Sequence, residues 1–275
     1  MSGVNPLIFL HIPKTAGTTV HHIIHNEYRG MKFFTSGYYK HIEKFEKLSD
    51  AEKKKIRVLK GHFPFGVHTI YPEPVTYFTF FRDPIKRSIS DFNYLYQNNT
   101  LVFHETIMRE QYSLKDMLKG GYIKNFDNCH VRFLAGANDL EYGKINEETY
   151  ALALHNFDTY FEAFGIAERF DESLIYLKRK LKWSSPFYVN ANVSEKKSYV
   201  NKFDEETIQL LNHYNRYDLL LYDYAYKKFD AIVRSGGEPF AKEVARFKKL
   251  NSLQSPLRSL ARKIWKIFFK SPNQN

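Results

Sequence analysis

The sequence predicts an α/β fold, in which a central, mainly parallel sheet is flanked by helices and a basic amphipathic helix follows at the C-terminus. Short apolar runs alternate with segments of helical periodicity, which is the pattern of βαβ units. The run at residues 75–82 is apolar on both faces, as expected of a strand inside a covered parallel sheet. The 275 residues, 43% of them hydrophobic, are enough for one large domain with a sizeable core.

The expected elements begin with a strand at residues 7–12, followed by a tight turn and a helix over residues 13–24, where Val and Ile recur at helical spacing. Residues 32–39 are rich in aromatic side chains, and their pattern fits no single type of element. A solvated helix is expected at residues 50–55, and residues 56–63 return to the composition of a strand.

The strongest strand candidate, VTYFTFFR at residues 75–82, leads directly into a helix. Asp83 is a favourable N-cap residue, and Pro84 suits the first helical position because its ring fixes φ and no amide donor is needed there. The buried side of this helix is marked by apolar residues at helical spacing, namely Ile85, Ile89, Phe92 and Tyr96.

The rest of the domain is predicted to be mostly helical, with one further strand. Helices are expected over residues 113–158, a strand at 159–166, and then a helix with an apolar stripe within residues 174–181. The segment 183–199 is a polar loop rich in Ser, Asn and Lys, and residues 204–230 are again helical by their apolar spacing.

Most of the positive charge lies in the last segment of the chain. The formal net charge is +11, but residues 242–275 alone contain nine basic residues and one acid, a net charge of +8. The preceding body therefore carries only +3, which disfavours a nucleic-acid-binding domain. We expect one domain at residues 1–240 and a basic helical appendage at residues 241–275.

Residues 257–270, LRSLARKIWKIFFK, combine an apolar stripe with basic residues on the other helix faces. This composition is typical of a helix that lies on an anionic membrane surface. The same stripe would also suit packing on the chain's own domain, or on a second copy in a homo-oligomer. The sequence leaves these alternatives open.

The single cysteine, Cys129, excludes an intrachain disulfide and any multi-cysteine zinc site. No apolar run approaches the about 20 residues needed to cross a bilayer, and the short run at residues 7–10 has neither the length nor the preceding basic residues of a signal peptide. We expect a reduced, soluble, cytoplasmic protein, with its tail as the possible contact with a membrane.

The turn HIPKTAGTTV, residues 11–20, has the composition of an anion site. A strand that ends before a helix begins leaves free amide groups and the positive end of the helix dipole at one place. Gly17 allows close approach of the backbone, Lys14 adds a positive charge, and hydroxyl donors come from Thr15, Thr18 and Thr19. The loop is not a Walker A motif, because Lys14 precedes Gly17. The alternative is an ordinary strand-to-helix turn with a capping threonine.

A second motif, FRDPIKRSIS at residues 81–90, follows the strongest strand. Arg82 falls at the carboxyl end of that strand, where ligands bind in open α/β sheets, and Ser90 lies two helical turns further on. A guanidinium matches two phosphate oxygens, and a hydroxyl adds a third hydrogen bond. The alternative is a surface ion pair between Arg82 and Asp83 or another carboxylate.

Together these two motifs resemble those of the PAPS-dependent sulfotransferases, in particular the heparan and dermatan 2-O-type carbohydrate sulfotransferases and their bacterial relatives. The resemblance implies a P-loop-like three-layer domain and an enzyme that uses PAPS (3′-phosphoadenylyl sulfate) as its sulfuryl donor. It implies a 5′-phosphosulfate site formed by Lys14, Thr15, Gly17, Thr18 and Thr19, and a 3′-phosphate site formed by Arg82 and Ser90.

The resemblance spans residues 6–200 and includes two further landmarks. FGIAERFDESL, residues 164–174, is similar to a family segment to which we assign no chemistry. NVSEKKS, residues 192–198, resembles the loop that closes over the cofactor, which implies contacts from Ser194, Lys196 and Lys197. A solvated loop would have the same composition.

His62 lies in the segment KGHFPFG, after the strand predicted at residues 56–63. The resemblance implies that this histidine is the general base. Independently, transfer to a hydroxyl requires removal of a proton, for which neutral imidazole is suited near pH 7. The alternatives are a structural histidine at a strand end, or a more distant Glu or Asp as the base.

Three further histidines, His21, His22 and His25, alternate with the apolar stripe of the first helix. We expect them to face solvent and to hold no metal, because no third ligand has a suitable spacing.

The function implied by these motifs is in-line transfer of a sulfuryl group from PAPS to a hydroxyl, with a carbohydrate as the acceptor. His62 would take the proton and Lys14 would stabilise the developing negative charge. No metal is required, because Lys14, Arg82 and the backbone amides can balance the charge of the donor. Two alternatives remain: a P-loop-like nucleotide-dependent kinase, which should need Mg²⁺, and a peripheral membrane-binding protein with an inactive nucleotide fold.

Overall fold

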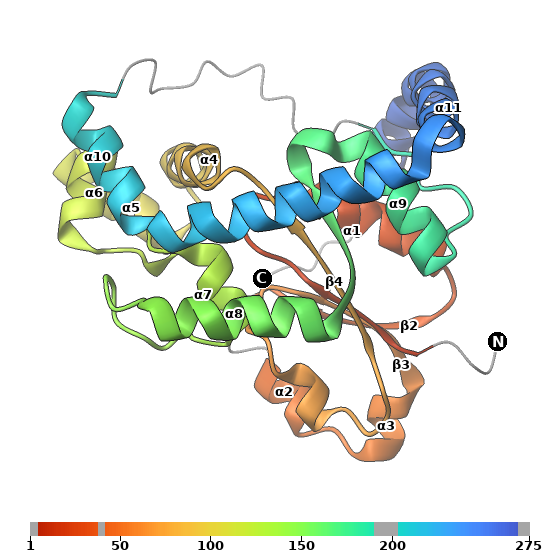
Figure 1. The fold of residues 1–275 in the computed structure, drawn as a ribbon, viewed down its shortest axis with the longest axis horizontal. Helices are drawn as coiled ribbons and strands as arrows, with labels where there is room; N and C mark the ends of the chain where they lie inside the picture. Colours follow the sequence, from red (N-terminus) through yellow and green to blue (C-terminus); the bar gives the residue numbers. More distant parts are fainter. Residues whose placement is uncertain (1–4, 38–41, 190–202, 269–275) are drawn as a thin grey trace.

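A central sheet of five parallel strands organises the molecule, with helices on both of its faces (Figure 1). The computed structural model describes residues 5–37, 42–189 and 203–268; for Val102 and residues 254–268 only the backbone is described. The strand order is β2-β3-β1-β4-β5. The predicted fold class, an α/β domain with a parallel sheet flanked by helices, is confirmed.

The strands are short, and the inner ones are almost entirely buried. They are β1 (Leu7–Leu10), β2 (Lys32–Ser36), β3 (Ile56–Gly61), β4 (Thr76–Phe81) and β5 (Phe161–Ile166). All four residues of β1 are buried, and its first residue, Leu7, pairs with Val58 on one side and Thr76 on the other. The segment that fitted no single element, 32–39, contributes the edge strand β2.

The helices follow the strands in the alternation expected of βαβ units. They are α1 (Gly17–Glu27), α2 (Ile42–Glu46), α3 (Asp50–Lys55), α4 (Pro84–Gln97), α5 (Val102–Glu110), α6 (Leu114–Gly120), α7 (Cys129–Ala135), α8 (Glu147–Tyr160), α9 (Phe170–Leu181), α10 (Glu205–Tyr214) and α11 (Arg216–Phe268). Short 3₁₀ turns occur at η2 (Val67–Ile70), η3 (Lys124–Phe126) and η4 (Ala167–Arg169). Figure 1 shows α11 crossing the molecule from the side of α10 to the side of α9.

The start of α4 follows the prediction closely. Asp83 is the N-cap residue, its carboxylate accepts a hydrogen bond from the amide of Lys86 at 2.8 Å, and Pro84 occupies the first helical position. The predicted apolar stripe contributes buried Phe92 to a second, smaller core between α4, α5, α6 and α10. This second core includes Ile107 of α5, a helix that was not among the elements expected from the sequence.

The first residues of the predicted C-terminal appendage pack on the body of the domain. The helical geometry of α11 breaks at Gly237, where φ is 56°, but the helix continues across the predicted boundary at residues 240/241. Val244 and Phe247 are buried in the main core, and Glu243 pairs with Lys178 and Arg179 of α9 at 2.9 and 2.7 Å. No helix in the described part of the chain is long and apolar enough to span a bilayer.

Candidate active site

Three strands deliver polar segments to the same edge of the sheet. The loop that begins at His11 follows β1, His62 follows β3, and Arg82 follows β4. Because β1 lies between β3 and β4 and all three run parallel, their carboxyl ends meet at one place. The chain crosses from one side of β1 to the other between β3 and β4, which is the kind of switch point where α/β sheets bind ligands.

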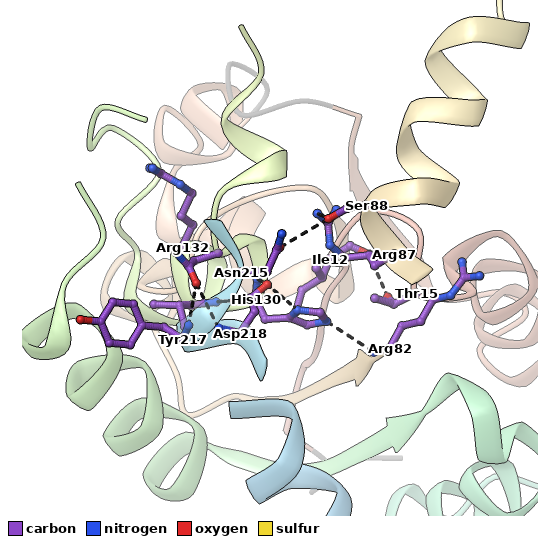
Figure 2. Close-up of polar contacts among 12 residues, drawn as sticks. Ile12, Thr15, Arg82, Arg87, Ser88, His130, Arg132, Asn215, Tyr217 and Asp218 are labelled. Carbon is purple, nitrogen blue, oxygen red and sulfur yellow. Dashed lines mark hydrogen bonds and ion pairs between the residues drawn. The ribbon is translucent and has the colours of Figure 1, made fainter. Parts of the chain in front are cut away.

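The loop after β1 is held in a tight, unusual backbone conformation. Lys14 and Ala16 both adopt left-handed conformations, with φ of 67° and 69°. The fully buried Thr15 lies between them, and its hydroxyl donates a hydrogen bond to the carbonyl of Ile12 at 2.8 Å (Figure 2). The Thr15 hydroxyl therefore bridges the loop on itself, and the predicted contact of Thr15 with a ligand stays a prediction.

Gly17 is the first residue of α1, and the structure explains why it must be glycine. A Cβ atom at this position would lie 1.6 Å from Nε2 of His11, a full overlap. The N-cap residue, Ala16, supplies no side-chain hydrogen bond to the first turn, and no acidic residue lies there. Thr18 is exposed and Thr19 half-buried beside it. The first turn of α1 therefore has neither a side-chain cap nor an acidic residue, which is compatible with an anion at this helix end.

Arg82 joins the two predicted motifs directly. Its Nη1 donates a hydrogen bond to the carbonyl oxygen of Lys14 at 2.9 Å. Asp83, the partner considered as an alternative, instead caps α4. Burial holds the pKa of the Arg82 guanidinium below its usual value, although at neutral pH the group remains charged.

Lys14 packs against the face of α4 that carries Ser90 and Tyr94. The Lys14 ammonium is 3.9 Å from the centroid of the Tyr94 ring, and Tyr94 is one helical turn beyond the half-buried Ser90. Residues four apart share a helix face, so Ser90 is turned toward the loop that carries Lys14. Burial is the main cause that lowers the pKa of Lys14, and the nearby Asp91 carboxylate partly offsets it.

A hydrogen bond to the main chain holds the ring of His62. Its Nδ1 lies 2.8 Å from the carbonyl oxygen of His11, and a carbonyl only accepts, so Nδ1 must carry the proton. In the neutral ring, Nε2 is then an acceptor. Burial lowers the pKa of His62 below the usual 6.5, which keeps the ring neutral at pH 7. These are the properties required of a general base.

A cluster of histidines that the sequence pattern does not predict lies next to His62. The rings of His11 and His62 have centroids 4.2 Å apart, and Nδ1 of His11 is 3.0 Å from Nε2 of His21. The expectation that His21 faces solvent is wrong: it is half-buried and burial lowers its pKa to about 3. His21 lies one turn after Gly17, on the face of α1 that meets His11, whereas His22 and His25 are exposed.

Arg87 was not among the predicted site residues. It lies in a polar part of α4, where a basic side chain is expected to face solvent. It is fully buried, and its Nη2 donates to the Ser88 hydroxyl at 3.0 Å and to the carbonyl of Asn125. Its Nη1 forms an ion pair with Asp91 at 3.6 Å. Neither Nε nor Nη1 has a hydrogen-bond partner among the described residues. This second arginine adds positive charge behind Lys14 and Arg82.

Ser194, Lys196 and Lys197, predicted to contact the cofactor from a closing loop, lie outside the described residues. Within the described ranges, no group of three or more His, Cys, Asp or Glu side chains is placed to hold a metal ion.

Comparisons with known proteins add one family and one structure. The sequence model of the galactose-3-O-sulfotransferase family matches residues 2–259. No curated protein sequence matches the chain. Among solved structures, the fold is similar to the mouse sulfotransferase SULT7A1 complexed with PAP, at 12% identity and a TM-score of 0.41, over 77% of this chain and 85% of that one.

Proposed function

Because this chain belongs to the galactose-3-O-sulfotransferase family and is therefore a PAPS-dependent sulfotransferase, we propose that the Lys14 loop and the Arg82–Ser90 segment bind the two phosphate ends of PAPS. The observation that carries this proposal is the hydrogen bond from Arg82 Nη1 to the Lys14 carbonyl, 2.9 Å long. It brings together two motifs that are 68 residues apart in the sequence.

The residues present fit a doubly phosphorylated nucleotide. The open N-terminus of α1, with Gly17, Thr18 and Thr19, offers amides and hydroxyls to the 5′-phosphosulfate, and Lys14 offers a full charge. Arg82 and Ser90 offer a fork of donors and a hydroxyl to the 3′-phosphate. The amide of Thr15, and not its hydroxyl, belongs to this donor set, because the hydroxyl is bonded to Ile12.

PAPS, when bound, supplies a sulfuryl group attached to a phosphate that leaves as adenosine 3′,5′-bisphosphate. The acceptor oxygen forms the new S–O bond while the bond from sulfur to the bridging oxygen breaks. The acceptor proton passes to Nε2 of His62, which the bond from Nδ1 to the His11 carbonyl leaves as the acceptor. The Lys14 ammonium stabilises the negative charge that develops on the leaving phosphate.

We propose a carbohydrate hydroxyl as the acceptor, and the 3-hydroxyl of galactose as the first candidate to test. The family assignment supports this choice. A glycan with a free galactose 3-hydroxyl should accept sulfate, whereas the same glycan with that hydroxyl methylated should not.

Calorimetry with adenosine 3′,5′-bisphosphate and with ATP tests the proposed donor. Strong preference for the 3′-phosphorylated ligand, with transfer that survives EDTA, is expected from the proposed site. A nucleotide-dependent kinase makes the opposite prediction, with ATP preferred and transfer lost when Mg²⁺ is removed.

For the tail we propose contact with an anionic membrane from the cytoplasmic side through residues 257–270. The support is the sequence pattern together with the net charge of the segment from residue 242 onward. Co-sedimentation with vesicles that contain an anionic lipid, compared with neutral vesicles, tests it. Equal binding to both would remove the electrostatic part of the proposal, and a concentration-dependent mass without binding would favour a second subunit instead.

A further inference from the structure

Helices α7 and α11, which lie outside the predicted motifs, cap each other's N-termini in the buried interior. The carboxylate of Asp218, in the first turn of α11, accepts from the amides of His130 and Val131 in α7, both at 2.9 Å. In return, the side-chain oxygen of Asn128 accepts hydrogen bonds from the amides of Tyr217 and Asp218, at 2.9 and 3.1 Å. Each helix thus satisfies the free N-terminal amides of the other, which fixes their relative position.

The ring of His130 connects this interlock to the site. It is fully buried, and its Nδ1 is 2.8 Å from Oδ2 of Asp218, so the carboxylate holds the proton on Nδ1. The ring also stacks on Phe81, the last residue of β4, with centroids 5.6 Å apart and planes 15° from parallel. Its Nε2 accepts a hydrogen bond from the backbone amide of Arg82, with 3.4 Å between the two nitrogens (Figure 2).

A second connection reaches α4 from the same turn of the chain. Asn215 directly precedes α11, and its side-chain oxygen accepts from the Ser88 hydroxyl at 3.4 Å. Its amide nitrogen donates to the carbonyls of Phe126 and Leu211, at 3.3 and 2.9 Å. Asn215 is fully buried, so these contacts hold α4 near Ser90 against the start of α11.

We propose that His130 and Asp218 are positioning residues for the 3′-phosphate site, in which Asp218 orients the His130 ring and the ring anchors the backbone of Arg82. The inference rests on the proposed role of Arg82. Arg82 would then be fixed at both ends, at its amide by His130 and at its guanidinium by the Lys14 carbonyl. Because misplacement of a binding group by about 1 Å can cost about 10²-fold in activity, a group that sets this backbone matters to ligand binding.

The contacts of the two ring nitrogens of His130 can be removed one at a time. This distinguishes the positioning role from a merely structural one. In His130→Asn, the amide nitrogen lies near the position of Nδ1 and can still donate to Asp218, but the acceptor for the Arg82 amide is lost. In His130→Gln, the side-chain oxygen reaches the position of Nε2 and can accept from Arg82. Asn156→Leu is the matched control, because it removes a buried hydrogen bond, 2.9 Å long, to the Leu134 carbonyl at the far end of α7.

The measurement is titration calorimetry of the full chain with adenosine 3′,5′-bisphosphate and adenosine 5′-monophosphate. The ratio of the two Kd values gives the preference for the 3′-phosphate. His130→Asn should lower this preference about tenfold, whereas His130→Gln and Asn156→Leu should keep it, even if their thermal stability falls. If His130→Asn does not fold, the Gln variant alone decides, because loss of the preference in a folded Gln variant contradicts the proposal.

Arg82→Ala separates failure of this inference from failure of the proposed function. If Arg82→Ala keeps the 3′-phosphate preference, Arg82 is not a phosphate ligand and the proposed site is wrong. If Arg82→Ala abolishes the preference but His130→Asn retains it, the site stands and the positioning role is overturned. Equal loss in His130→Asn and Asn156→Leu would also overturn it, because general loosening of α7 would then explain both.

Discussion

A hydrogen bond to the main chain sets the tautomer of His62, the residue that we propose as the general base. The His11 carbonyl fixes the proton on Nδ1, and burial keeps the ring neutral. A neutral ring can accept a proton near pH 7, as the proposed role requires. Its proton affinity is low, so the acceptor proton should be transferred late, as the S–O bond forms.

His62→Ala should lower kcat by about 10²- to 10⁴-fold, the usual contribution of a positioned general base. Binding of adenosine 3′,5′-bisphosphate, measured by calorimetry, should be unchanged, because the proposed phosphate ligands are elsewhere. The kcat of the unmodified enzyme should be constant around pH 7 and fall on acidification below the usual imidazole pKa of 6.5, as His62 gains a proton. Loss of nucleotide binding in the variant would show that His62 supports the fold instead.

Lys14→Ala should lower kcat at saturating PAPS by about 10²-fold or more, the effect of losing one group that stabilises developing charge. Lys86→Ala is the control, because Lys86 is an exposed lysine in the first turn of α4. Near-normal kcat in the Lys14 variant would remove Lys14 from catalysis.

At the scale of an element, the first turn of α1 leaves room for the ring of His11, because Gly17 has no side chain. Gly17→Ala should lower the free energy of unfolding by about 1–3 kcal/mol, because the added methyl overlaps the ring and one of them must move. The displaced loop should also bind adenosine 3′,5′-bisphosphate more weakly. Urea unfolding and calorimetry measure the two effects, and Gly30→Ala, where a Cβ meets nothing within 4 Å but φ is +85°, separates backbone strain from overlap.

The histidine cluster formed by His11, His21 and His62 makes the free energy of unfolding depend on pH. His11, His21 and His62 have pKa values below the usual 6.5, so below that pH the unfolded chain binds protons that the folded chain does not. The free energy of unfolding should therefore fall as the pH drops below 6.5 and should gain nothing from these groups above it. His21→Gln should flatten the profile in urea titrations, and His22→Gln, on the exposed face, should not. A steeper profile in the His21 variant would contradict the assignment.

The elements whose signals are local could be predicted from the sequence. Strands β1, β3, β4 and β5, the cap at Asp83 and the loop before Gly17 depend on neighbouring residues, and each was expected. The edge strand β2 was not, because its burial depends on pairing with β3. His21 was misjudged because its partner, His11, is supplied by the loop after β1, ten residues earlier. The interlock of Asn128 with Asp218 joins residues 90 apart, for which no local pattern exists.

For the whole molecule, α11 is the element that connects the parts. Its first turn contacts α7, and residues beyond Gly237 pack on α9. The body and the predicted appendage therefore share a core, because Val244 and Phe247 are only 6% and 5% exposed.

Two truncations test where the domain ends. Removal of residues 254–275 should leave nucleotide binding and the free energy of unfolding nearly unchanged. Removal of residues 241–275 should cost about 3–6 kcal/mol, because two further buried apolar side chains are lost. Equal stability of both forms, measured by urea unfolding, would establish the boundary at residue 240 that the sequence predicts.

The interlock at Asp218 also has a consequence for biosynthesis. The Lys14 loop and Arg82 leave the ribosome long before Asp218, so a nascent chain carries both proposed phosphate-binding segments without the residue that we propose to position Arg82. Because contacts between residues far apart in the sequence form slowly, we expect the strands to pair before α11 docks on α7. Sulfate donor in the cell should thus meet a competent pocket only after translation has passed α11, and pausing of the ribosome before that point would leave the strands exposed to chaperones.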